Sequence, residues 1–327
     1  MLKFDPNELL NPDLQADKFT ELALEVFKYQ YAHNSVYRQY CNLLDVSVSS
    51  VTDIDKIPFL PIEFFKQFKV VCDDAPVEAI FRSSTTTGFI PSEHHVSLDW
   101  YEKSFLGGFM YFYGMPGAYC IIGVLPSYLE RGDSSLVYMV DRLMRISGHK
   151  DGGFYLYNYS ELEDKLQRLT DKGVPLILFG VTFALLDLAE RRNLELSTTI
   201  IIETGGMKGR RKELIRSELH DILHSTLRPK RIDSEYGMTE LLSQGYKIGD
   251  APFRPVPWMK VLAKEVNDPF GTFTDKTGLL HIIDLANIYS CSFIATKDLG
   301  RVYPDGTFEV SGRYDHSEAR GCNLMVM

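Results

Sequence analysis

Apolar residues recur at helical spacing near the start of the chain. Within residues 8–45, Phe19, Leu22, Val26 and Phe27 fall on one face of a helix. A stripe of this kind is typical of a helix whose apolar face packs against a protein core. We therefore expect the N-terminal region to be helical and to form part of the folded body.

Two segments separate this region from the rest of the chain. Residues 57–61 contain two prolines and predict a stiff, extended connection. Residues 97–113 predict an aromatic-rich helix that Gly107 and Gly108 break, since glycine is a poor helix former.

From residue 119 onward, short apolar runs alternate with amphipathic segments. The expected strands are 119–124, 154–157, 174–179 and 199–202, and the expected helices are 134–146, 160–173, 182–192 and 212–223. The helix at residue 160 opens with a capping box formed by Ser160 and Glu163. Strands that alternate with helices predict an α/β fold whose mostly parallel sheet is covered by helices on both faces.

After residue 255 the pattern resembles β-hairpins. Residues 279–283 predict a strand, and residues 302–310 predict two strands around an Asp-Gly turn. We therefore expect a small C-terminal β subdomain. The predicted divisions are an α/β core with a helical N-terminal region at 1–255, the β subdomain at 256–313 and a tail at 314–327.

The composition excludes several classes of protein. The chain has 327 residues, 45% of them hydrophobic and 24% charged, which is ordinary for a soluble globular enzyme. A net charge of -9 argues against a nucleic-acid partner. No apolar run approaches the ~20 residues that cross a bilayer, and we expect no signal peptide from the first residues. The 5 cysteines show neither paired metal spacing nor a disulfide framework, so we expect a reducing cytoplasm.

The first chemical signal is a run of hydroxyl side chains closed by a glycine: Ser83, Ser84, Thr85, Thr86, Thr87 and Gly88. Backbone N–H groups and hydroxyls in such a loop can surround a polyphosphate, and the glycine allows close approach. The run lacks the lysine of P-loop NTPases. The structural alternative is an ordinary Ser/Thr-rich loop.

Four further motifs follow in a fixed order. They are Glu203-Thr204-Gly205-Gly206, Tyr236-Gly237-Met238-Thr239-Glu240, Thr296-Lys297-Asp298-Leu299-Gly300 and Ser311-Gly312-Arg313-Tyr314-Asp315. The last three have a plain structural alternative each, namely a helix start at Thr239, a turn at Asp298 and a solvated arginine at Arg313.

Taken together, these motifs resemble the adenylate-forming superfamily of acyl-CoA synthetases, peptide-synthetase adenylation domains and firefly-type luciferases. The closing segment, residues 315–324, is most similar to the acyl-protein synthetases of bacterial bioluminescence. The phenylacetate-CoA ligases are the next nearest group. The resemblance spans residues 83–322 and implies the large N-terminal domain of this superfamily.

The resemblance implies that ATP and Mg²⁺ are the cofactors. Residues 83–88 would hold the β- and γ-phosphates, Thr239 would contact the α-phosphate, and Glu240 would bind Mg²⁺ as a hard oxygen ligand. The remaining implied nucleotide contacts are Gly205, Gly206, Tyr236 and Gly237 around the adenine, Asp298 on the ribose hydroxyls, and Arg313 on the ribose or a phosphate.

The end of the chain bears on the second half-reaction. Many members of the superfamily continue past the Gly-Arg-x-x-Asp segment into a mobile lid that carries a catalytic lysine, and we expect that lid to be missing here. Cys322 matches the cysteine on which the bioluminescence synthetases are acylated, and Arg320 and His316 nearby favour its thiolate. The alternative is a tail cysteine without a role.

The sequence therefore predicts an ATP-dependent enzyme that forms an acyl-adenylate and then an acyl thioester. The acceptor would be Cys322 or the thiol of a partner, which could be a carrier protein, CoA or a reductase. Residues 101–113 and 179–183 are the expected acyl pocket and suit an apolar or aromatic acid. The alternatives are a lid-less ligase of the phenylacetate-CoA type and a non-catalytic nucleotide-binding scaffold.

Two smaller features stay open. Either His94 or His95, just after the hydroxyl run, could reach the phosphates or the acyl carbonyl. The basic cluster at residues 208–212 is either a solvated surface or a guide for an anionic partner.

Overall fold

The structure is a computed structural model that describes residues 4–84, 90–125, 132–205, 214–265, 272–273 and 275–314. It divides into two compact units, of which unit 1 comprises Met1–Ala75 with Pro257–Met327 and unit 2 comprises Pro76–Val256. The N-terminal helices, which the sequence assigned to the α/β core, thus group with the C-terminal β region.

Unit 2 is built on the predicted parallel sheet. Its strands run in the order β8-β7-β6-β4-β5, and β9 and β10 extend it antiparallel next to β8. The bounds are β4 (Cys120–Val124), β5 (Gly153–Phe154), β6 (Leu176–Val181), β7 (Thr199–Thr204), β8 (Arg231–Tyr236), β9 (Gly245–Lys247) and β10 (Phe253–Pro255). All residues of β4, β6 and β7 are buried, as expected for strands covered on both faces.

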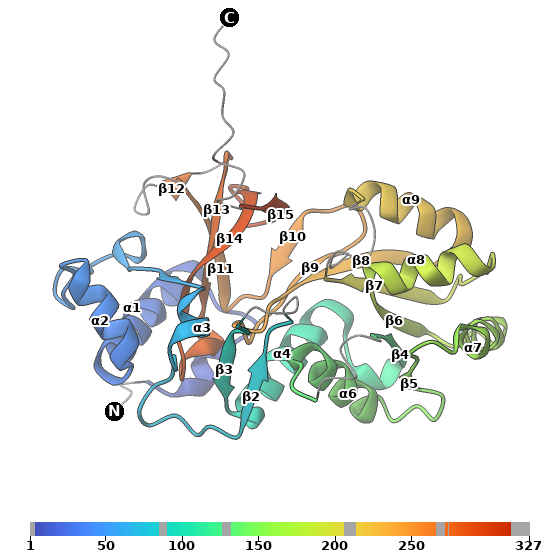
Figure 1. Cartoon of the computed structure of the whole chain (residues 1–327), viewed down its shortest axis with the longest axis horizontal. Coiled ribbons are helices and arrows are strands. Elements are labelled where there is room, and N and C mark those ends of the chain that lie inside the picture. The colour runs from blue at the N-terminus through green and yellow to red at the C-terminus, as the bar shows by residue number, and fades with distance from the viewer. Residues whose placement is uncertain are drawn as a thin grey trace, which may run out of the picture. The chain divides into compact units, whose positions relative to one another are not determined.

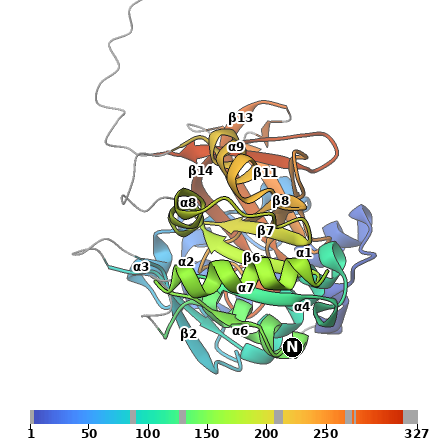
Figure 2. The same cartoon turned by 90° about the vertical axis from the view of Figure 1, so that its right-hand side faces the viewer.

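Helices cover both faces of this sheet. Figures 1 and 2 show α8 and α9 on one face and α4 and α6 on the other. The helices are α4 (Leu98–Tyr113), α6 (Ser135–Ser147), α7 (Tyr159–Asp171), α8 (Thr182–Arg191) and α9 (Arg216–Leu227), with a short 3-10 helix, η3 (Pro116–Ala118).

Two local predictions in unit 2 were wrong. Gly107 and Gly108 do not break α4, which runs without interruption from Leu98 to Tyr113, and a Cβ at Gly108 would lie 3.1 Å from Val256 Cγ1. Ser160 and Glu163 do not form a capping box, because α7 begins one residue earlier at Tyr159. Both side chains instead bind Arg191 of α8, at 3.1 Å for Ser160 Oγ and 2.7 Å for Glu163 Oε1.

A separate antiparallel pair, β2 (Ala79–Arg82) and β3 (Glu93–Val96), flanks the hydroxyl run. Beyond β2, Ser83 N donates to Ser92 O at 3.0 Å, and Ser92 N donates to Ser83 Oγ at 2.8 Å. The hydroxyl run therefore begins as the connection of a β-hairpin.

Unit 1 contains the predicted β region. The strand order is β12-β11-β13-β14-β15, all antiparallel, and β1 pairs parallel with β14. The bounds are β1 (Leu60–Pro61), β11 (Met259–Lys264), β12 (Thr272–Phe273), β13 (Thr277–Asp284), β14 (Phe293–Val302) and β15 (Phe308–Arg313). The Asp-Gly turn between β14 and β15 is confirmed, with Gly306 at φ 82°.

The N-terminal helices pack on this sheet within unit 1. They are η1 (Pro6–Leu10), α1 (Ala16–His33), α2 (Ser35–Leu43), η2 (Ile54–Lys56) and α3 (Phe64–Gln67), and η4 (Leu285–Asn287) follows β13. Phe27 of α1 and Tyr37 of α2 lie 6.3 and 6.0 Å from the ring of Phe293. The amide of Gln30 donates to Asn287 O at 2.9 Å and accepts from Ser292 N at 3.0 Å, which fixes α1 to the loop before β14. Within the described residues, no helix combines the length and apolarity needed to cross a membrane.

Candidate functional site

The second and third motifs meet at the carboxyl ends of two neighbouring parallel strands. Thr204, at the end of β7, is the register partner of Glu235 in β8. Gly205 follows β7, and the segment Tyr236–Glu240 begins at the last residue of β8. Ligands of open α/β sheets bind beyond the carboxyl ends of the strands. The fold therefore brings these two predicted parts of the site together.

Gly205 adopts a conformation that favours glycine. Its φ is 72°, in the left-handed region, and Thr182 Oγ1 donates to its carbonyl at 2.7 Å. The same Thr182 hydroxyl lies 2.9 Å from Glu203 Oε1. Thr182, which the sequence analysis did not single out, thus fixes the turn after β7. Gly206 lies outside the described residues.

Tyr236 lies on the α9 face of the sheet. Its ring packs at 6.1 Å against Phe253, and the guanidinium of Arg216, at the start of α9, lies 4.9 Å from the Phe253 ring. Ser234, which points the same way as Tyr236 along β8, lies 3.5 Å from His220 of α9. The predicted stacking of Tyr236 on adenine stays a prediction.

Gly237 lies against the carboxyl group of Glu235. A Cβ at Gly237 would lie 2.3 Å from Glu235 Oε1, so the carboxyl group would have to shift to admit a side chain there. The Thr204 hydroxyl donates to the other oxygen of the same carboxyl group. Burial, and to a smaller extent the charge of Glu203, raises the pKa of Glu235 to about 7, although the hydrogen bond from Thr204 lowers it in part. The sequence analysis missed Glu235, because no motif role pointed to it.

His94 connects the β2–β3 hairpin to the Tyr236–Glu240 segment. Its Nδ1 lies 2.8 Å from the carbonyl oxygen of Thr239. Because a carbonyl only accepts, Nδ1 carries the proton. Burial lowers the pKa of His94 to about 4, so the ring is neutral at physiological pH. Of the two histidines left open by the sequence, His94 therefore holds the segment that carries Thr239 and the buried Glu240, which is 4% exposed.

The hydroxyl run is described only at its start. Ser83 Oγ accepts a hydrogen bond within the hairpin, and Ser84 is exposed. Thr85, Thr86, Thr87 and Gly88 lie outside the described residues. Phosphate binding by this run stays a prediction.

Asp298 and Arg313 are brought together in unit 1. They are register partners on β14 and β15, and Arg313 Nε lies 3.8 Å from Asp298 Oδ1. The backbone N–H of Asp298 donates to Thr296 Oγ1 at 3.1 Å, which holds the strand at this point. The Arg313 side chain is 73% exposed and the Asp298 side chain 18%, so a ligand can reach both. The predicted acceptor Cys322 lies outside the described residues.

The predicted acyl-pocket residues are mostly interior. Tyr101, Phe105 and Phe109 of α4 are buried, as are Phe179 and Phe183. They supply the apolar and aromatic surface that the sequence predicted, although their contact with an acyl group stays a prediction.

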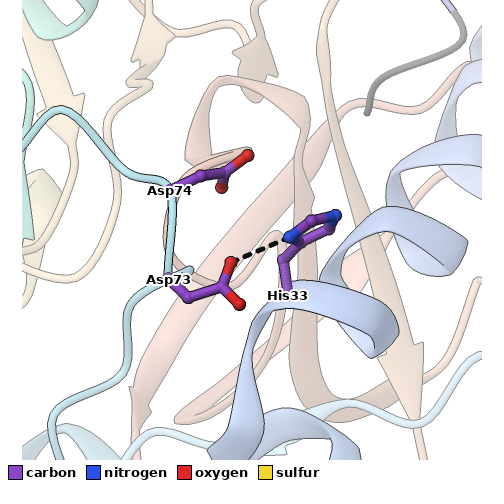
Figure 3. A group of neighbouring side chains, drawn as sticks. All are labelled: His33, Asp73 and Asp74. Carbon is purple, nitrogen blue, oxygen red and sulfur yellow. Dashed lines mark hydrogen bonds and ion pairs between the residues drawn. The ribbon is translucent and has the colours of Figure 1, made fainter.

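A separate group in unit 1 has ligand-type side chains. His33, Asp73 and Asp74 each offer one ligand atom, and these atoms lie within 4.8 Å of one another (Figure 3). His33 Nδ1 lies 2.8 Å from Asp73 Oδ1, and the Tyr29 hydroxyl donates to Asp74 at 2.5 Å. Both carboxylates are exposed. These hydrogen bonds connect the end of α1 to the turn at residues 72–74, and this structural role is sufficient to explain why the three side chains lie together.

Comparison with known proteins supports the resemblance seen in the motifs. Residues 1–101 match the family described as "Acyl-protein synthetase, LuxE". A long-chain-fatty-acid–luciferin-component ligase of Vibrio harveyi is 21% identical over 332 residues, which cover 94% of this chain and 86% of that protein. A protein of the same description from Photorhabdus luminescens is 35% identical over 69 residues, 21% of this chain and 59% of that protein. The predicted similarity to bioluminescence-type acyl-protein synthetases is confirmed.

Solved structures show the fold. A 2-hydroxyisobutyryl-CoA ligase in complex with 2-HIB-AMP and CoA has a TM-score of 0.70 at 13% identity, covering 96% of this chain and 74% of that chain. ATP-bound MatB from Rhodopseudomonas palustris has a TM-score of 0.55 at 16% identity, covering 72% of this chain. This chain spans about half the length of MatB, covering 48% of it. The predicted α/β fold of adenylate-forming enzymes is confirmed.

Proposed function

We propose that this protein activates a carboxylic acid with ATP, forming an acyl-adenylate and pyrophosphate, and then passes the acyl group to a thiol. The observation that carries the proposal is the junction at the ends of β7 and β8. There Gly205, Thr239 and Glu240 sit on one sheet edge, and His94 ties Thr239 to the hairpin that bears the hydroxyl run.

The first half-reaction needs charge stabilisation rather than covalent help from the protein. A carboxylate oxygen of the acid attacks the α-phosphorus, and the bond to pyrophosphate breaks. Negative charge spreads over the phosphate oxygens in the transition state, so fixed donors lower the barrier. The hydroxyls of residues 83–87 and of Thr239 are suitable donors, and the neutral His94 holds Thr239 in place.

The residues present fit Mg²⁺ and ATP. Glu240 is a buried carboxylate in the segment that follows β8, and carboxylate oxygens are the ligands that Mg²⁺ prefers. When bound, Mg²⁺ would neutralise phosphate charge. The partly accessible carboxylate of Asp298 can accept both ribose hydroxyls, and the exposed guanidinium of Arg313 beside it can bind ribose or phosphate.

The second half-reaction transfers the acyl group to sulfur. The thiolate attacks the acyl carbon, the carbon–oxygen bond to AMP breaks, and a thioester and AMP result. Cys322 is the proposed acceptor, and a carrier protein, CoA or a reductase cysteine is the alternative. The names of the two relatives describe ligases of long-chain fatty acids. The buried aromatic residues of α4 are chemically suited to contact an apolar or aromatic acid.

Pyrophosphate release with a panel of carboxylic acids tests the proposal. We expect release that depends on ATP, Mg²⁺ and at least one acid. Thr86→Val should slow it by about 10²- to 10³-fold, as loss of one transition-state donor does. Glu240→Gln should raise the Mg²⁺ requirement. The matched control is Glu265→Gln, which changes an exposed carboxylate. ATP binding without pyrophosphate release for any acid would instead identify a nucleotide-binding scaffold.

A further inference from the structure

Residues at the end of β8 point alternately to the two faces of the sheet. Tyr236 faces α9, so the preceding residue, Glu235, faces α4. Tyr246 in β9 is the register partner of Glu235 and shares its face. Its ring lies 5.0 Å from Phe112 and 5.3 Å from Tyr113, both at the end of α4. Glu235 and Tyr246 therefore lie on the side where the aromatic residues of the expected acyl site are found.

Several polar groups gather on this face. Burial is the main cause that raises the pKa of Tyr101, and the negative charge of Glu235 is the second. Burial likewise raises the pKa of Tyr246, followed by the charges of Glu235 and Tyr101. The register pairing of Glu235 with Tyr246 places these two side chains next to each other. Gln244 also lies nearby, with Cγ 3.5 Å from the position of a Cβ at Gly237.

Two of these groups are buried without a hydrogen-bond partner in the described part of the chain. They are the hydroxyl of Tyr246, whose side chain is 0% exposed, and Oε1 of Gln244, at 4% exposed. Leaving a buried polar atom unpaired costs about 1–3 kcal/mol. Glu235 beside them is partly accessible, so a ligand can reach the cluster at the Glu235 carboxyl group. An apolar acyl chain would leave the Tyr246 hydroxyl and Gln244 Oε1 unsatisfied.

We propose that Glu235, Gln244 and Tyr246 form a polar recognition site for a hydroxyl group on the acyl chain, so that the preferred substrate is a hydroxylated carboxylic acid. This inference rests on the proposed acyl-activating function. A hydroxyl both donates and accepts. It can donate to the carbonyl oxygen of Gln244 or to Glu235, and it can accept from the Tyr246 hydroxyl. The surrounding aromatic residues of α4 would contact the remaining carbon skeleton.

The test compares matched acids in ATP–pyrophosphate exchange. The probes are octanoate against octanoates hydroxylated next to the carboxylate or at the far end, and phenylacetate against para-hydroxyphenylacetate. A site built to bind a substrate hydroxyl discriminates strongly against the analogue that lacks it. We expect kcat/KM to favour one hydroxylated acid over its parent by about 100-fold or more.

Variants separate recognition from folding. Tyr246→Phe keeps the ring packing and removes only the unpaired hydroxyl, and it should lower the preference about 5- to 10-fold. Glu235→Leu should reduce the preference for the hydroxylated acid below about 10-fold. It should lower kcat/KM for the hydroxylated acid and raise kcat/KM for the parent acid. Tyr157→Phe, at an exposed tyrosine, is the matched control and should leave the preference unchanged.

The outcomes distinguish this inference from the proposed function. If parent acids react as fast as hydroxylated ones and Tyr246→Phe changes nothing, the recognition site is refuted while acyl activation stands. If no acid supports exchange, the proposed function fails and this inference fails with it. A preference confined to amino acids would also overturn the assignment to a hydroxyl.

Discussion

The carboxyl group of Glu235 should make the stability of unit 2 depend on pH. Its pKa is about 7 in the folded protein, against 4.5 for an ordinary glutamate. Between these values the folded state keeps a proton that the unfolded chain has lost. The free energy of unfolding therefore falls as pH rises through this window. The contribution is fully present below about pH 4.5 and is lost above about pH 7.

The size of the effect follows from the two pKa values. A difference from 4.5 to about 7 corresponds to about 3 kcal/mol at most, since each pKa unit is worth ~1.4 kcal/mol. Glu235→Gln keeps an acceptor for the Thr204 hydroxyl but cannot ionise. The stability difference, wild type minus Glu235→Gln, should therefore fall by about 2–3 kcal/mol between about pH 5 and about pH 8.

Urea denaturation followed by tryptophan fluorescence measures this difference. The chain has 2 tryptophans, Trp100 in unit 2 and Trp258 in unit 1, so a Trp258→Phe background reports unit 2 alone. His94 and His220 have pKa values lowered to about 4, mainly by burial, and destabilise the fold as pH falls below 6.5. Their effect is common to both proteins and cancels in the difference. A difference that stays constant across this range would refute the reasoning.

Three further predictions address other parts of the site. Asp298→Ala should weaken ATP binding about 10-fold or more by calorimetric titration, since a charged hydrogen-bond partner is worth ~1.5–3 kcal/mol; unchanged affinity would remove Asp298 from the ribose site. Gly237→Ala should destabilise the protein by about 1–3 kcal/mol in chemical denaturation because its Cβ would meet Glu235 Oε1 at 2.3 Å, and the added change Glu235→Ala should recover part of that loss. Cys322→Ser should still form the acyl-adenylate but lose the hydroxylamine-sensitive acyl adduct seen by intact mass, because serine is a much weaker nucleophile without an activating base; the same adduct on the variant would rule out Cys322 as the acceptor.

The sequence predicted most elements of the parallel sheet because its strands are continuous apolar runs. It missed β8, whose residues Arg231–Tyr236 are largely polar. The structure shows why a polar strand can be buried here: Arg231 binds Asp233 through two hydrogen bonds of 2.7 and 2.9 Å, and Asp233 also accepts from Gly249 N at 2.9 Å. These hydrogen bonds depend on tertiary contacts, so the periodicity of the sequence does not predict them.

The same limit applied to the candidate site. Motif order alone points to Gly205, Thr239 and Glu240 as candidates, since each belongs to a recognisable short segment. It gave no role to Thr182, whose hydroxyl fixes the turn at Gly205 from another element. His94 was noticed for its proximity to the hydroxyl run, but only the fold shows that it binds the Thr239 carbonyl.

The end of β8 explains how one short segment can serve two parts of a substrate. Alternation along the strand sends Tyr236 toward α9 and Glu235 toward α4. If the nucleotide lies against Tyr236 and the acyl group lies beside Glu235, the mixed anhydride that joins them would lie at the strand end. Gly237 then follows directly on the two residues that face the nucleotide and the acyl group. The Glu235 carboxyl group lies where a Cβ at Gly237 would be, and the chain leads from Gly237 into Thr239 and Glu240. Substitutions on the two faces should therefore separate: changes at Glu235 or Tyr246 should alter the choice of acid, while changes on the Tyr236 face should alter the affinity for ATP.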